Sequence, residues 1–234
     1  MLDIHLPYKG IRGFSEFLIH LFTITVGLLI AVQIESFVEW RHHLHLAEEA
    51  REALRAEIEH NLKDLKDAQL GLKVWREQID ADLAVMQRIQ DNPNDAKAQQ
   101  STLSVNFSSM TWGDTAWRTA QSTGALAYMP YEEAEQYSNI YQTQSALMAL
   151  EAKPLEDTSE ILGLISRYNW HDADKKIVIR KKITTEQAGA VAEKLTHAQM
   201  HLLIGDLLLQ ECIENSQAYL ENRKSRTNFT ESLH

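Results

Sequence analysis

Residues 17–34 read FLIHLFTITVGLLIAVQI, and this stretch decides the architecture that the sequence predicts. It contains no Asp, Glu, Lys or Arg and lies between Glu16 and Glu35. As a helix it spans about 27 Å, which is close to the roughly 30 Å hydrocarbon thickness of a bilayer. We therefore expect one transmembrane helix.

The alternative is a buried helix in the core of a soluble protein, because the stretch has the minimum length for spanning a membrane. Its apolar character on all sides favours the bilayer, since a surface helix carries a polar face. A cleaved signal peptide is disfavoured, because helical patterning continues through Glu35 with no small-residue cleavage site. Aromatic residues flank the stretch, as expected at the level of the headgroups: Tyr8, Phe14, Phe17, Phe37 and Trp40.

The composition of the whole chain predicts few, long helices. The 234 residues include only 9 glycines and 4 prolines, so turn formers are scarce. The formal net charge of −10 argues against nucleic acid as a partner, because phosphate backbones select basic surfaces. Cys212 is the only cysteine, which excludes a disulfide within the chain and a thiolate metal cluster.

Residues 35–91 are predicted to form one long helix that continues from the apolar stretch. Apolar residues recur there at steps of three and four, the period of a helical stripe. Asn92-Pro93 ends the helix, because proline cannot continue the hydrogen-bond ladder. A helix of this length, roughly 75 Å from Trp40 to Gln90, needs partners to bury its stripe.

The following residues are predicted to supply these partners. Residues 96–113 are irregular, with one alternating stretch around Leu103 that is compatible with a short strand. Asp114 is the expected N-cap of a short helix that runs through Ala127. A helix from Pro130 to about Ala152 follows, and after an interruption at Pro154 the helical pattern resumes over 155–170.

The last helix has the strongest pattern in the chain. Thr184 and Gln187 have the spacing of a capping box at its start. Its apolar positions alternate by three and four as in a heptad seam: Ala188, Val191, Leu195, Ala198, Leu202, Gly205, Leu209, Cys212, Ser216 and Tyr219.

We therefore expect an all-α protein with an N-terminal transmembrane helix that continues into an elongated antiparallel helical bundle. The predicted organisation is a short N-terminal segment (1–16), the transmembrane helix with its interface (17–40), the bundle domain (41–222) and a disordered tail (223–234).

Two stretches resemble a family of uncharacterised bacterial single-pass membrane proteins with a helical domain of unknown function. The first is Ile24–Ile34 running into Glu39-Trp40, and the second is Ala116–Leu126, followed by Met129–Glu133 and Tyr137. The resemblance implies a bacterial membrane protein. It supplies no activity and no functional residue.

The sequence offers no candidate catalytic, cofactor-binding or metal-ligating site, so we expect a protein that is not an enzyme. His197 and His201 share a helix face, but Ala198 stands where a helix-borne zinc enzyme needs its glutamate base. His42, His43 and His45 lie just after the predicted membrane exit and are best interpreted as interfacial or solvated. An aromatic group is compatible with a ligand pocket but is more typical of core packing: Trp112, Trp117, Tyr128, Tyr131, Tyr137 and Tyr141.

Small and polar residues form one face of the predicted transmembrane helix. Thr23, Gly27, Ala31 and Glu35 recur every four residues, with His20 and Glu39 nearby. Small residues let helix backbones approach, and polar residues avoid lipid by facing a partner. We expect this face to contact another transmembrane helix.

A basic stretch in this acidic chain predicts contact with lipid headgroups. If residues 130–170 return toward the membrane, the stretch comes near the bilayer surface, where basic residues attract anionic headgroups. The alternative is that the stretch is a solvated loop. The basic residues of this stretch are Lys175, Lys176, Arg180, Lys181 and Lys182.

The predicted function is that of a non-enzymatic scaffold or accessory subunit, which assembles with itself or with a larger membrane complex. The alternative is an extracytoplasmic sensor whose helical bundle binds a ligand. The short segment before the apolar stretch favours a signal anchor, with the bulk of the chain in the periplasm and the helix in the bacterial inner membrane.

Overall fold

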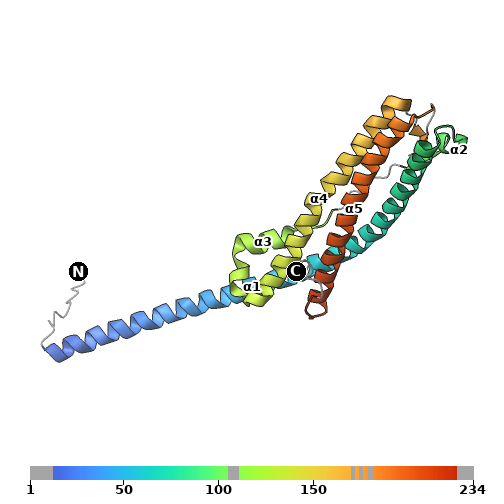
Figure 1. The fold of residues 1–234 in the computed structure, drawn as a ribbon. Coiled ribbons are helices and arrows are strands. Elements are labelled where there is room, and N and C mark those ends of the chain that lie inside the picture. Colours follow the sequence, from blue (N-terminus) through green and yellow to red (C-terminus); the bar gives the residue numbers. More distant parts are fainter. Residues whose placement is uncertain (1–12, 105–110, 170–171, 174–175, 179–181, 226–234) are drawn as a thin grey trace, which may run out of the picture. The chain divides into compact units, whose positions relative to one another are not determined.

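The computed structural model describes residues 13–104, 111–169, 172–173, 176–178 and 182–225. Its contacts divide the chain into two compact units, Met1–Glu49 and Ala50–His234. The first helix, α1 (Phe14–Asp91), belongs to both (Figure 1). The predominance of helix confirms the expected all-α class.

The second unit is built on three long helices. They are the part of α1 that follows Ala50, α4 (Tyr131–Asn169) and α5 (Thr185–Leu220). The shorter elements are α2 (Ala96–Gln99), α3 (Thr115–Thr123) and the 3-10 helix η1 (Ala125–Tyr128).

The directions of the helices correct the predicted bundle, which is not antiparallel throughout. Contacts between α1 and α4 follow the same order in both helices, with Arg51 on Glu133 and Asn61 on Gln144, so these two helices run parallel. Only α5 runs against them. Asn92 directly follows α1, whereas Gly113 contacts Asn61 near the other end of the second unit, so the chain has returned before α4 begins. The periodicity gives no sign of this return.

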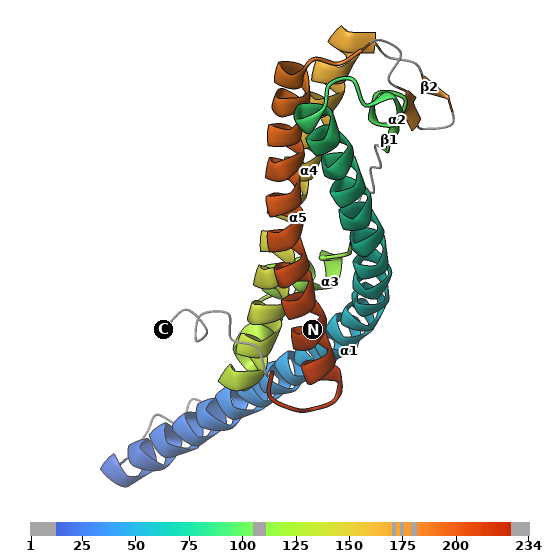
Figure 2. The same cartoon turned by 45° about the vertical axis from the view of Figure 1, so that its right-hand side comes forward.

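A small antiparallel sheet joins two distant loops, as Figure 2 shows. The strand β3 (Lys176–Val178) lies between β1 (Thr102–Ser104) and β2 (Asp172–Ala173). Leu103 pairs with Ile177, so the expected short strand is confirmed at Leu103, whereas Val105 and Phe107 lie outside the described residues.

The core of the second unit is formed by the stripes that the periodicity predicts. On α5 the buried positions match the predicted seam from Ala188 to Ser216, and the last buried residue is Ala218 in place of Tyr219. On α1 the fully buried side chains include Leu54, Ile58 and Leu65. The capping box at Thr184 and Gln187 is also confirmed.

Two predicted helix boundaries are wrong, each for a physical reason. The helix expected through Ala127 stops after Thr123, because Gly124 adopts the left-handed conformation (φ 74°) that caps a helix end. Conversely, α4 continues through Pro154. Proline removes one helical hydrogen bond, and burial of Leu147 before it and Ile161 after it offsets that loss.

Candidate functional site

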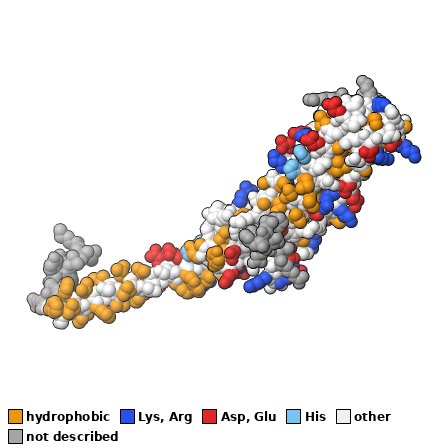
Figure 3. All heavy atoms as spheres, in the orientation of Figure 1, with side chains coloured by type: hydrophobic (Ala, Val, Ile, Leu, Met, Phe, Trp, Pro, Cys, Tyr) orange, Lys and Arg blue, Asp and Glu red, His pale blue; other side chains and the backbone are white. Residues whose placement is uncertain are grey.

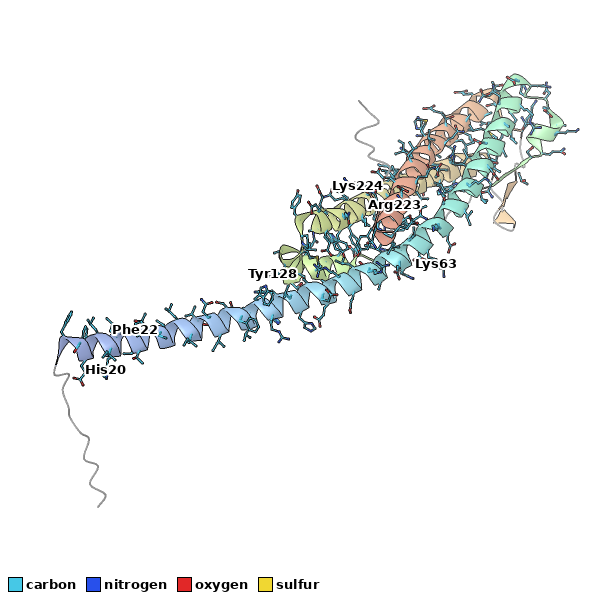
Figure 4. All side chains as sticks on the ribbon, turned by 90° about the horizontal axis from the view of Figure 1, so that it is seen from below. His20, Phe22, Lys63, Tyr128, Arg223 and Lys224 are labelled. Atoms are coloured by element: carbon cyan, nitrogen blue, oxygen red, sulfur yellow. The ribbon has the colours of Figure 1, made fainter. Side chains whose placement is uncertain are left out.

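The apolar stretch of α1 is the most unusual surface of the first unit. Its large side chains are exposed around the whole helix, with Phe22 and Ile24 each at 69%. Figure 4 shows Phe22 and His20 projecting from the helix. This is one helix that is long and apolar enough to cross a membrane, and none of its apolar window is buried.

The polar side chains of this stretch bond to their own helix. The hydroxyls of Thr23 and Thr25 donate to the carbonyl oxygens of Ile19 and Leu21, at 2.9 and 2.8 Å. The hydroxyl of Ser36 makes the same bond four residues back, at 2.9 Å. Such bonds satisfy hydroxyl groups where no water is available.

The four residues of the predicted helix contact, Thr23, Gly27, Ala31 and Glu35, all lie exposed on α1. A Cβ placed on Gly27 would meet no atom within 4 Å. The space beside the glycine is therefore open. Contact of this face with another helix stays a prediction.

The two described residues of the basic stretch, Lys176 and Lys182, lie at the end of the second unit where α1 finishes. Lys182 donates to Asn94 Oδ1 at 2.6 Å, and Lys176 belongs to β3, whereas Lys175, Arg180 and Lys181 lie outside the described residues. Because α4 runs parallel to α1, residues 130–170 lead away from the Ala50 end. This direction does not support the return toward the membrane that headgroup contact assumes, and that contact stays a prediction.

A polar network at the Ala50 end of the second unit centres on Glu57 of α1. Its carboxylate accepts the N–H groups of Ala116 (2.9 Å) and Trp117 (3.4 Å) at the start of α3, and the hydroxyl of Tyr141 (2.7 Å). Glu57 therefore caps α3 from another helix. Asp114 was predicted to cap it, but its side chain makes no cap bond and instead pairs with Arg118.

Asn61, one turn further along α1, holds the backbone of Gly113 at two points. Its Oδ1 accepts the Gly113 N–H at 2.9 Å, and its Nδ2 donates to the Gly113 carbonyl at 2.7 Å. The side chain is fully buried. A Cβ on Gly113 would lie 3.2 Å from Glu57 Oε2, so glycine permits this close approach.

These contacts also fix the orientation of the Gln144 amide. The Gly113 N–H requires Asn61 Oδ1, so Asn61 Nδ2 faces Gln144 Oε1 at 3.3 Å. Gln144 Nε2 then finds no acceptor among the described residues, and neither does Trp112 Nε1. Both side chains are buried, and a water molecule could accept a hydrogen bond from each of these two donors.

Tyrosines extend the network. The ring of Trp117 stacks on Tyr141 with centroids 5.0 Å apart, and the hydroxyls of Tyr137 and Tyr219 lie 2.7 Å apart. Burial raises the pKa of both Tyr137 and Tyr141 well above its usual value, and the bond to Glu57 adds to this for Tyr141. Because Tyr128 and Tyr131 are exposed, the aromatic group does not line one pocket.

The arrangement stabilises structure, because all three donors converge on the Glu57 carboxylate. Two of the described histidines contact a single carboxylate each: His201 Nδ1 lies 2.5 Å from Asp157 Oδ2, and His45 contacts Glu49. In the described part of the chain, no three His, Cys, Asp or Glu side chains gather as metal ligands do. Burial raises the pKa of the Cys212 thiol to about 12, which makes it a poor nucleophile.

A groove of about 390 Å³ lies between α4 and α5. Arg223 at its edge is held by Glu214 through two bonds, at 2.5 and 2.9 Å, so its charge is already balanced. The lining also includes the carboxylate of Glu211 and six neutral polar side chains: Gln136, Asn139, Gln142, Thr143, Asn215 and Ser225. Its size is within the range of small-molecule sites.

Comparison with known proteins gives no independent assignment, since the chain matches no family model, no curated protein and no solved structure.

Proposed function

We propose that this protein is a single-pass membrane protein whose second unit works, without catalysis, as a scaffold or accessory subunit of a membrane protein assembly. The main support for this proposal is the exposed apolar stretch of α1. The same helix continues from this stretch into a unit that has its own core. A soluble protein would expose this stretch to water at a cost of roughly 25 cal/mol for each Å².

The polar contacts support a structural role for the second unit. Glu57 and Asn61 use their hydrogen-bonding groups to hold α3 and Gly113, as a scaffold requires. The resemblance to bacterial single-pass proteins leads us to infer an inner-membrane location. We further infer that the second unit lies on the periplasmic side of this membrane.

The test is purification of the full chain from its native membranes in mild detergent, with quantification of whatever accompanies it. A partner protein, or a second copy, in fixed stoichiometry is expected. Gly27→Leu with Ala31→Leu, which would crowd the predicted helix contact, should lower recovery of that assembly, whereas Leu28→Ala on the same helix should not. A monomer without partners would contradict the proposal.

Orientation has its own test. A phosphatase fused after His234 should be active, because the enzyme folds in the periplasm, and a fluorescent protein at the same place should stay dark. The reverse pair of results would place the second unit in the cytoplasm.

A second candidate function, ligand sensing, follows from the groove between α4 and α5. Its neutral amide and hydroxyl side chains suit an uncharged, hydrogen-bonding small molecule. Mass spectrometry of the purified protein under native conditions would favour this function if it found such a molecule bound, and if Asn139→Leu removed it.

A further inference from the structure

The outer face of α5 carries an apolar patch that the core does not use. Met200, Leu203, Ile204 and Leu207 are exposed by 52, 39, 43 and 42%. Their spacing places them on one side of the helix, opposite the buried seam at Leu202. Figure 3 shows hydrophobic side chains gathered over the middle of α4 and α5. We call these four residues the α5 patch.

A groove of about 470 Å³ lies beside the α5 patch, between α1 and α5. Asp206, which follows Leu203 by three residues and is therefore its neighbour on the helix surface, forms part of its wall together with six residues of α1. They are Gln69, Leu70, Lys73, Arg76, Glu77 and Asp80. The patch and the groove together form a surface on which a further helix can lie along α5.

The charges around the α5 patch are predominantly acidic. Glu193 precedes Met200 by one heptad, and Glu211 follows Ile204 by one heptad. The residues that line the groove include three carboxylates and two cations. Arg76 is already bound to Asp206 at 2.9 Å, and Lys194 on the other side of α5 is bound to Glu160 at 2.6 Å. The border therefore favours a partner with positive charge.

This charge pattern discriminates between possible occupants. A second copy of α5 would place Glu193 opposite itself in a parallel pair, where like charges repel. In an antiparallel pair Glu193 would face Glu214, which Arg223 already balances, so the second copy would offer Glu193 no cation. An anionic lipid surface requires basic residues around the apolar ones. A partner helix with Lys or Arg beside its apolar stripe meets neither obstacle.

We propose that the α5 patch and its groove bind an amphipathic helix of a partner protein, whose apolar residues recur at i, i+3, i+4 and i+7 with Lys or Arg beside them. The inference rests on the proposed role as an accessory subunit. It assigns the contact to α5, whereas the role itself requires only that some partner is bound.

Site-specific photocrosslinking of the full chain in native membranes tests this proposal. The benzophenone amino acid replaces Leu207 in one protein and Lys63, an exposed residue of α1, in the control (Figure 4). We expect the photoproduct at position 207 to join a peptide with the stated apolar and basic pattern. Leu203→Glu should lower its yield by about tenfold or more, as loss of a central interface residue does. Thr196→Glu, with a negative charge one heptad away, should have little effect.

The other outcomes overturn the proposal. They are a photoproduct with a second copy of this chain, with lipid, or with a peptide that lacks basic residues, and a yield at position 207 no higher than at position 63. If a stoichiometric partner still purifies with the protein, only the assignment to α5 fails. If no partner purifies either, the role as an accessory subunit fails with it.

Discussion

The two parts of α1 distribute their apolar residues in opposite ways on the same backbone. Between Phe17 and Phe37 the large apolar side chains are exposed around the whole helix, whereas after Ala50 most of them lie in one buried stripe that includes Leu54, Ile58 and Leu65. Polar groups differ in the same sense. Thr23 bonds to its own helix, but Glu57 and Asn61 bond to other elements. The two parts of one helix therefore present different surfaces, as the proposed membrane-spanning role of the first part requires.

The largest expected difference between the two parts concerns core packing. Ile58→Ala should lower the free energy of unfolding of the second unit by about 2–5 kcal/mol, because it removes a fully buried side chain. Leu28→Ala should leave that free energy unchanged, because Leu28 is 65% exposed. Urea denaturation in detergent, followed by the fluorescence of the tryptophans, measures both. If both variants lost the same free energy of unfolding, the two parts of α1 would not differ in core packing as described.

Buried polar groups should show the next largest difference. Asn61→Ala leaves the N–H and carbonyl of Gly113 without their partners, which should cost about 1–3 kcal/mol. Thr23→Ala removes only a bond within α1 and should not change the stability of the second unit. The same denaturation experiment decides, and an Asn61→Ala protein as stable as the parent would show that the contact with Gly113 is dispensable.

Capping of α3 predicts a smaller effect. Glu57→Ala should cost about 1 kcal/mol, as the loss of an N-cap side chain does, and should speed hydrogen exchange at Ala116 and Trp117. Asp114→Ala is the matched control, since its side chain makes no cap bond. Faster exchange in the Asp114 variant than in the Glu57 variant would show that Asp114, as the sequence predicted, and not Glu57 caps α3.

The pH dependence of stability should reflect the buried tyrosines. The pKa of Tyr141 is raised by burial and by Glu57, so the folded state holds the phenol proton more tightly than the unfolded state. Stability from this source is complete below about pH 10, the ordinary tyrosine value, and falls as the pH rises above it. Tyr141→Phe should weaken that alkaline loss, as measured by unfolding between pH 9 and about 11. An unchanged profile would exclude Tyr141 as its source.

Sequence periodicity predicts the local structure of this chain well, and its tertiary contacts less well. The α5 seam up to Ser216, the capping box at Thr184 and the end of α1 depend on neighbouring residues, and each was predicted correctly. The parallel direction of α4 was not predicted, because heptad spacing does not encode helix direction. Likewise, Asn61 and Gly113 are far apart in the sequence, and an asparagine within an apolar stripe was the only signal of their contact.

The most direct test of the central claim measures whether the apolar stretch of α1 lies in the hydrocarbon of a bilayer. Cysteine is placed at Leu28 or at Leu70, an exposed residue of the second unit, and a hydrophilic maleimide is supplied on both sides of the membrane. Buried Cys212 gives little background, because its raised pKa leaves almost no thiolate. We predict labelling of Leu70→Cys at once and of Leu28→Cys only after the bilayer is dissolved and the protein denatured. Equal labelling of the two in intact membranes would contradict a transmembrane helix.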